Sequence, residues 1–128
     1  MREKQNERME RLPDSELAVM CLIWEEEKPV GTGYLAEILG EQRGWTRSTI
    51  QVLLARLEEK GFLTCQKEGR RKLYRPRIAM EDYRRSETKT FLERFYHNSY
   101  KGLITALVQE ENLTEEDAQE LMDIIKNS

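Results

Sequence analysis

The segment 46–59 carries short side chains where a helix that only met water would gain from charged ones. A rotation of about 100° per residue places Ser48, Val52 and Ala55 opposite an apolar stripe. Hydroxyl and methyl groups suit the edges of base pairs, and the major groove of DNA admits an α-helix. Gln51, on the flank, has an amide that can bridge N6 and N7 of adenine. We therefore expect this face to recognise DNA, with helix propensity or a packing surface as the alternative.

A second candidate surface is the tip of a predicted basic hairpin. The predicted turn is residues 68–71, and the cations around its tip are Lys67, Arg70, Arg71, Lys72, Arg75 and Arg77. Protection of a sheet edge would explain roughly one or two lysines, whereas this density of cations suits phosphates or the adjacent minor groove. Tyr74 has a ring that suits the core and a hydroxyl that can donate to a phosphate. The predicted DNA contacts are Thr46, Arg47, Ser48, Thr49, Gln51, Val52, Ala55, Arg56, Arg70, Arg71, Lys72 and Tyr74.

The elements that position these residues follow the order helix, short strand, helix, helix and hairpin. Gly40 is expected to end the short second helix, and Thr46 to cap the third. The strands of the hairpin are expected within residues 62–75. This order predicts a fold that is mainly α with a small β-hairpin, a winged helix-turn-helix over residues 12–78. The expected core stripes are Leu17, Met20, Cys21 and Trp24 of the first helix, and Ile50, Leu53, Leu54 and Leu57 of the third.

Residues 79–128 are predicted to be helical, with little room for a break over 83–108 and a last helix capped by Thr114. A segment of about 50 residues cannot easily bury so many apolar groups alone. They either pack back on the winged helix or, as we favour, form a C-terminal helical dimerisation arm. Residues 1–11 are expected to be a disordered arm. The predicted dimer contacts are Phe91, Phe95, Tyr96, Tyr100, Leu103, Ile104, Leu107, Leu121, Met122 and Ile125.

The distribution of charge favours a polyanion as a partner. The chain has a net charge of −3, yet residues 41–77 contain ten Lys and Arg against four Asp and Glu. The remainder has eleven basic residues against twenty acidic ones. A basic middle between acidic ends indicates one face built for double-stranded DNA, with an ordinary solvated cluster as the alternative.

Several classes of protein find no support in the sequence. No apolar run approaches the roughly 18 residues of a membrane span, and residues 1–10 have no signal-peptide core, so a cytoplasmic location without membrane contact is expected. Cys21 and Cys65 are expected to be buried, reduced thiols, with a disulfide or a redox role as the alternative. His97 is the only histidine. With no zinc cluster, phosphate loop or Cys–His pair, we expect no metal, no cofactor and no enzyme.

Blocks along almost the whole chain after residue 12 match a known pattern. The segment WTRSTIQVLLARLEEKG at residues 45–61, with LAVMCLIW at residues 17–24, resembles the penicillinase-repressor family of winged-helix transcriptional regulators. Gly69, Arg70 and Tyr74 are similar to its wing, and residues 89–92 and 113–125 to its dimer arm. The resemblance implies a homodimeric repressor that binds a palindromic operator and represses resistance genes.

The resemblance also suggests possible inducing signals. In some members an induced protease cuts the dimer arm between Asn and Phe, and the matching bond here is Ala106–Leu107. Copper-responsive members carry C-terminal Cys-x-Cys motifs, which are absent from residues 113–128, so copper sensing is not expected. An inducing protease or a small ligand is thus left open as a further partner.

Two other functions remain as alternatives. A winged-helix regulator of the MarR type would hold a small ligand between the DNA-binding module and the arm, and would release DNA when an aromatic compound binds. A winged-helix module that binds only proteins would use Val52 and Ala55 for a protein partner. Its affinity for DNA would show no steep dependence on salt.

Overall fold

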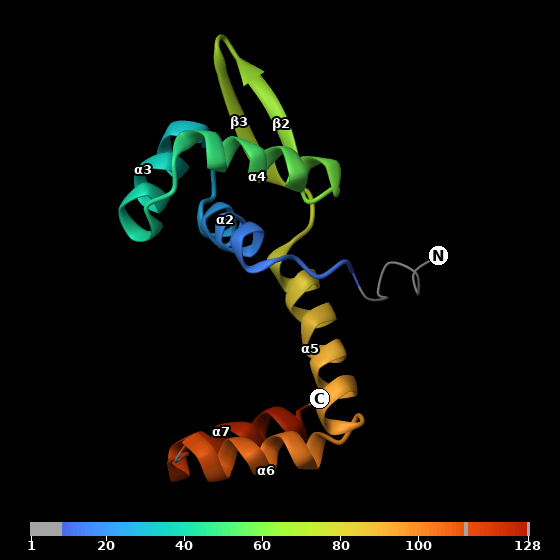
Figure 1. Ribbon diagram of the computed structural model, residues 1–128. Helices are drawn as coiled ribbons and strands as arrows, with labels where there is room; N and C mark the ends of the chain where they lie inside the picture. The colour runs from blue at the N-terminus through green and yellow to red at the C-terminus, as the bar shows by residue number, and fades with distance from the viewer. Residues whose placement is uncertain (1–8, 112, 128) are drawn as a thin grey trace. The chain divides into compact units, whose positions relative to one another are not determined.

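Helices α2 to α4 and a three-stranded antiparallel sheet make up the first part of the computed structural model, which describes residues 9–111 and 113–127 (Figure 1). The chain separates into two compact units, one up to Ser86 and one from Glu87 onward. The elements are α2 (Asp14–Glu25), β1 (Val30–Gly31), α3 (Thr32–Arg43), α4 (Arg47–Glu59), β2 (Leu63–Glu68), β3 (Arg71–Pro76), α5 (Met80–Tyr96), α6 (Tyr100–Glu111) and α7 (Glu115–Lys126).

The inner face of α4 forms the centre of the core. Its predicted stripe is confirmed, because Ile50, Leu53, Leu54 and Leu57 are all buried. Burying each such side chain contributes about 1.5–3 kcal/mol, which fixes the rotation of the helix and leaves its opposite face outward. The stripe lies in one core cluster with Val19, Met20, Ile23, Leu35, Leu39, Phe62 and Leu63.

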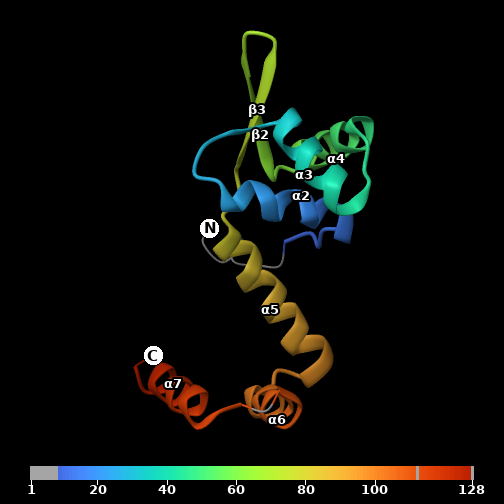
Figure 2. The ribbon, with the colours of Figure 1, turned by 90° about the vertical axis from the view of Figure 1, so that its left-hand side faces the viewer.

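Strands β2 and β3 form the predicted hairpin, with longer strands than expected. Glu68 pairs with Arg71 across a turn of Gly69 and Arg70, and the φ of 68° at Gly69 favours glycine there. Strand β1 adds to the other edge of β3 through Val30 and Tyr74. The hairpin projects beyond the helices of its unit in both ribbon views (Figures 1 and 2).

Two expectations for α2 and α3 were wrong. Helix α3 continues through Gly40 and ends at Arg43. It is capped by Gly44, whose φ is 71° and whose N–H donates to the Gly40 carbonyl at 2.9 Å. A glycine inside a helix costs only about 1 kcal/mol, and the left-handed cap forms at the second glycine. In α2 the buried residues are Glu16, Val19, Met20 and Ile23.

The rotation of α2 corrects the prediction for the cysteines. Cys21 is exposed and Cys65 is half-buried, and both are free thiols. Leu17 and Trp24 also lie at the margin of the core rather than within it. The predicted stripe was wrong because α2 carries apolar residues on most of its sides. Val19 and Ile23 occupy the face that packs against the core, in place of the predicted residues.

The predicted continuous helix over 83–108 was also wrong. His97 and Asn98 have φ values of 49° and 65°, so α5 ends at Tyr96 and α6 begins at Tyr100. Asparagine and histidine tolerate this left-handed conformation better than most residues. The predicted cap of α7 is confirmed, since the Thr114 hydroxyl accepts from the Asp117 N–H at 3.0 Å and Asp117 accepts in return. No helix of the described residues is long and apolar enough to span a membrane.

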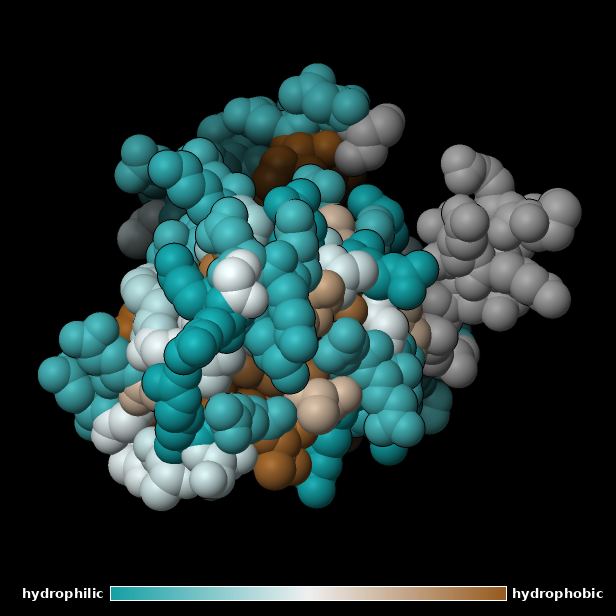
Figure 3. Space-filling view, turned by 90° about the horizontal axis from the view of Figure 1, so that it is seen from above, coloured by the Kyte–Doolittle hydropathy of each residue, from teal (hydrophilic) through white to brown (hydrophobic). Residues whose placement is uncertain are grey.

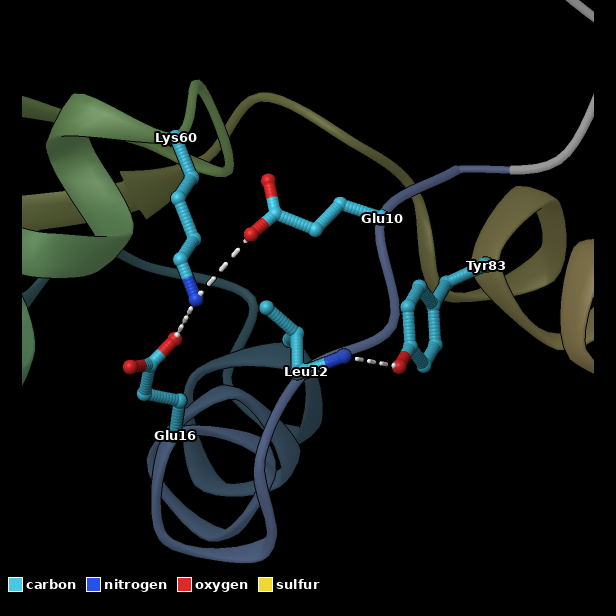
Figure 4. Close-up of polar contacts among 5 residues, drawn as sticks. All are labelled: Glu10, Leu12, Glu16, Lys60 and Tyr83. Atoms are coloured by element: carbon cyan, nitrogen blue, oxygen red, sulfur yellow. Dashed lines mark hydrogen bonds and ion pairs between the residues drawn. The ribbon is translucent and has the colours of Figure 1, made fainter.

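The segment before α2 is tied to the first unit. Residues 1–8 of the predicted disordered arm lie outside the described residues. Residues 9–11 lie beside α5, where the Met9 N–H donates to the Ser86 hydroxyl at 2.8 Å. Glu16 is buried and pairs with Lys60 at the end of α4, and Glu10 approaches the same ammonium at 3.4 Å (Figure 4).

Candidate DNA interface

The start of α4 is held by a side-chain cap. The Thr46 hydroxyl accepts from the Thr49 N–H at 3.2 Å, as expected of an N-cap threonine. Trp45 packs against the core, and the Arg43 guanidinium lies 5.2 Å from the centre of its ring. This anchoring fixes the point at which α4 begins, while the hydroxyl predicted to meet a phosphate is already engaged in the cap.

A groove of about 610 Å³ lies between α4, the start of α3 and the hairpin. It contains four cationic side chains and one carboxylate, so an anion would gain from entering it. The view from beyond the hairpin tip shows mainly hydrophilic side chains with small apolar patches among them (Figure 3). Seven predicted DNA contacts line this groove, namely Arg47, Gln51, Ala55, Arg70, Arg71, Lys72 and Tyr74.

The remaining predicted contacts lie on the outer side of α4. Ser48 and Val52 are four residues apart and so share one ridge of the helix, and Val52 is 49% exposed. Thr49 and Arg56 are exposed on the neighbouring ridge. None of these side chains is buried under another part of the described chain. The face of α4 that the sequence indicated is therefore free to meet a partner.

Tyr74 lies at the floor of the groove and is 6% exposed. Burial raises the pKa of Tyr74 to about 12, and hydrogen bonding with the Cys65 side chain acts in the same direction. The phenol therefore stays protonated well above neutral pH, and its O–H already has a partner in the Cys65 side chain. Its ring belongs to the core, and the phosphate contact remains a prediction.

The start of α3 was missed as part of this groove. A methyl group added at Gly31 would lie 3.2 Å from Nη2 of Arg71, so the absence of a side chain lets that guanidinium lie close to the backbone. Gly33 lies near Arg47, but a methyl group added there would lie 3.7 Å from Nη1, an ordinary contact, so this position does not require glycine. The two glycines on either side of Thr32, at the start of α3, were the available signal, because glycine lets another group approach the backbone closely.

Two further residues that line the groove, Glu58 and Tyr34, were not among the predicted DNA contacts. Glu58 lines the groove together with Ala55 and supplies its carboxylate. Tyr34 donates its hydroxyl to Glu26 at 2.8 Å, and this bond raises the pKa of Tyr34. Neither residue has a sequence signal that separates it from an ordinary surface position.

Comparison with known proteins agrees with this arrangement. Residues 12–127 match the family model described as penicillinase repressor. The chain belongs to the penicillinase repressor family. The penicillinase repressor of Bacillus licheniformis is 33% identical over 121 residues, which cover 92% of this chain and 94% of that protein. The methicillin resistance regulatory protein MecI of Staphylococcus aureus (strain N315) is 26% identical over 114 residues, which cover 89% of this chain and 92% of that protein.

Solved structures of the family match the first unit. The DNA-binding domain of the repressor BlaI matches with a TM-score of 0.53 and 36% identity, over 60% of this chain and 93% of that chain. The monomeric form of Bacillus licheniformis BlaI in complex with the blaP half-operator matches with a TM-score of 0.52 and 36% identity, again over 60% of this chain and 93% of that chain. The predicted winged-helix fold is thereby confirmed. As a member of a family of repressors, the chain is not an enzyme.

Proposed function

We propose that this protein is a homodimeric DNA-binding transcriptional repressor of a resistance-type operon in the cytoplasm. Helix α4 would enter the major groove with Ser48, Gln51 and Val52, and the hairpin would hold the backbone. The observation that carries this proposal is the exposed outer face of α4 beside a groove with four cations. The half-operator bound by the relative supports recognition of one half-site by each winged helix.

The arm supports the dimeric part of the proposal. Phe95 and Tyr100 are 65% and 72% exposed within a single chain. Large apolar groups in such number normally meet a partner surface. A second copy is the partner that a palindromic operator requires. The other exposed residues of the predicted interface are Phe91, Leu107, Met122 and Ile125, and the half-buried ones are Tyr96, Leu103, Ile104 and Leu121.

The decisive experiment selects duplexes from a randomised library with the full chain, and measures binding as salt is raised. A repressor of this kind should enrich a two-fold symmetric sequence, and its affinity should fall steeply between about 50 and 200 mM salt because phosphate contacts release counterions. Enrichment of no sequence would contradict the proposal. Release of the selected DNA by a small aromatic compound would favour the ligand-responsive alternative.

Arg71→Ala is expected to weaken binding to all duplexes alike. The guanidinium lines the groove and lies against Gly31, where it can meet a phosphate of an entering duplex. Loss of one phosphate contact should reduce the salt slope by about 1. Fluorescence anisotropy with selected and scrambled duplexes measures both effects, and Arg84→Ala on α5 serves as the control. A loss confined to the selected duplex would show that Arg71 contacts bases.

Gln51→Ala is expected to relax sequence preference at one base pair of each half-site. The amide lies in the groove on the outward side of α4, where it can form the paired hydrogen bonds that distinguish adenine. The loss of discrimination should be about 1–3 kcal/mol at that position. Competition with single-substituted duplexes locates the position. Uniform weakening at all positions would instead assign Gln51 to the backbone.

A further inference from the structure

The guanidinium of Arg71 lies against the backbone of β1 at Gly31. A methyl group added at Gly31 would be 3.2 Å from Nη2 of Arg71, closer than the usual contact of about 3.5–4.0 Å. The same methyl group would lie 3.8 Å from Cδ2 of Leu73 and 3.9 Å from the Lys72 carbonyl oxygen, which are ordinary contacts. Of these three neighbours, only the guanidinium would have to move to admit a side chain.

The pairing of β1 with β3 explains this approach. Gly31 pairs with Leu73 in the antiparallel register. Arg71 precedes Leu73 by two residues, so its side chain leaves the same face of the sheet and lies diagonal to Gly31. Diagonal neighbours on one face of a sheet are within reach of a long side chain. Strand β1 thus places a residue without a side chain beside the first residue of β3.

The backbone of Gly31 does not itself require glycine. Its φ of −89° and ψ of 160° describe an extended conformation that is open to every residue. Gly31 is also the N-cap of α3 and makes no side-chain hydrogen bond there, whereas serine or aspartate would satisfy a free N–H of the first turn. What glycine supplies at this position is therefore space, and the Arg71 guanidinium lies in it.

The guanidinium also keeps its N–H donors free for a ligand. Within residues 9–111 and 113–127 it has no hydrogen-bond or ion-pair partner, although Glu68 faces Arg71 in the register of the hairpin. Fixing a long side chain on binding normally costs roughly 2- to 10-fold in affinity, because rotamer freedom is lost. A guanidinium that already lies against β1 has fewer conformations to lose.

We propose that Gly31 is a positioning residue for Arg71. The space beside Gly31 keeps the guanidinium in the groove, so that Arg71 meets the duplex as an ordered phosphate contact of the hairpin. Arg70 lies in the turn, outside the paired register, and is not positioned in this way. The inference rests on the proposed function and deepens it, because it assigns different roles to two neighbouring arginines.

The test is a double-mutant cycle on the full chain. Gly31→Val is introduced into the wild type, into Arg71→Ala and into Arg70→Ala, and fluorescence anisotropy measures binding to the selected and scrambled duplexes. We expect Gly31→Val to weaken binding to both duplexes by about fivefold in the wild type and in Arg70→Ala. In Arg71→Ala the loss should be less than about 1.5-fold, since no guanidinium remains to be displaced. Gly31→Ala, which demands a smaller movement, should cost about twofold with the same pattern.

Two further measurements separate this effect from a change in the fold. Gly40→Ala, inside α3, adds a methyl group 3.5 Å from the Trp45 carbonyl oxygen and is the matched control, with binding and thermal unfolding expected to stay close to the wild type. Nitrogen-15 relaxation of the arginine Nε groups in the free protein needs no DNA. The Nε of Arg71 should be more ordered than that of Arg70, and Gly31→Val should abolish the difference.

Two results would overturn the inference. One is a loss of affinity on Gly31→Val that is absent from the folded variant, or equal with and without Arg71, which would leave Gly31 with a role in capping α3 alone. The other is unchanged relaxation of the Arg71 Nε in Gly31→Val. A wild type that binds neither duplex would instead contradict the proposed function, and the inference would fall with it.

Discussion

Ala55→Glu is expected to weaken binding to the selected duplex by about 100-fold or more, while the winged helix stays folded. Ala55 is exposed and lines the groove, and Glu58 already supplies a carboxylate there. A second carboxylate would face the phosphates of an entering duplex, and like charges brought together at an interface cost several kcal/mol. A loss of about 2.8 kcal/mol corresponds to the 100-fold change.

The controls for this variant separate its local effect from its charge. Glutamate is nearly as good a helix former as alanine, so the midpoint of thermal unfolding should move little. Thr88→Glu adds the same charge at an exposed position on α5 and should change binding by less than about threefold, because distant charges are screened. A folded Ala55→Glu variant that binds the duplex as tightly as Thr88→Glu would show that this face of α4 does not enter DNA.

Lys60→Met is expected to lower the free energy of unfolding by about 3–5 kcal/mol, because it leaves a buried carboxylate without its partner. The side chain of Glu16 is 3% exposed, and its Oε1 lies 2.5 Å from Nζ of Lys60 (Figure 4). Urea unfolding followed by circular dichroism measures the loss. The double variant Glu16→Gln, Lys60→Met removes both charges and should recover most of it. A cost below about 1 kcal/mol for Lys60→Met would place the pair among ordinary surface ion pairs.

The same pair predicts how stability responds to alkaline pH. Hydrogen bonding to Glu16 raises the pKa of Lys60. A group whose pKa is raised on folding contributes stability that is complete below its ordinary pKa, about 10.4 for lysine, and is lost as the pH rises through the folded value. Tyr74, with its pKa raised to about 12, acts in the same direction. The fall in stability above about pH 10 should therefore be smaller in Lys60→Met than in the wild type.

Local signals in the sequence predicted much of the first unit. Thr46 caps α4 and the apolar stripe that follows it is buried, because capping and helical spacing act over only a few residues. Where two local signals competed, the prediction failed. Gly40 and Gly44 are both plausible ends of α3, and only the packing of Leu39 and Trp45 against the core selects the second.

The candidate interface was predictable where it depends on one helix and one hairpin. The outward face of α4 and the cations after Gly69 follow directly from residue spacing. The contribution of α3 did not follow, because Gly31 approaches Arg71 only after β1 has paired with β3. The contact of Lys60 with Glu16 joins residues 44 apart, and no local pattern encodes a contact over that separation.

The two cysteines have a practical consequence for studying assembly. Cys21 is exposed on α2, whereas Cys65 is half-buried and shares a hydrogen bond with Tyr74. Desolvation, together with Glu25 nearby, raises the pKa of the Cys21 thiol, so its thiolate fraction at neutral pH is small and its labelling becomes faster as the pH is raised. The sequence thus offers one attachment point for a spin label or fluorophore, with which the proposed dimer can be tested without engineered residues.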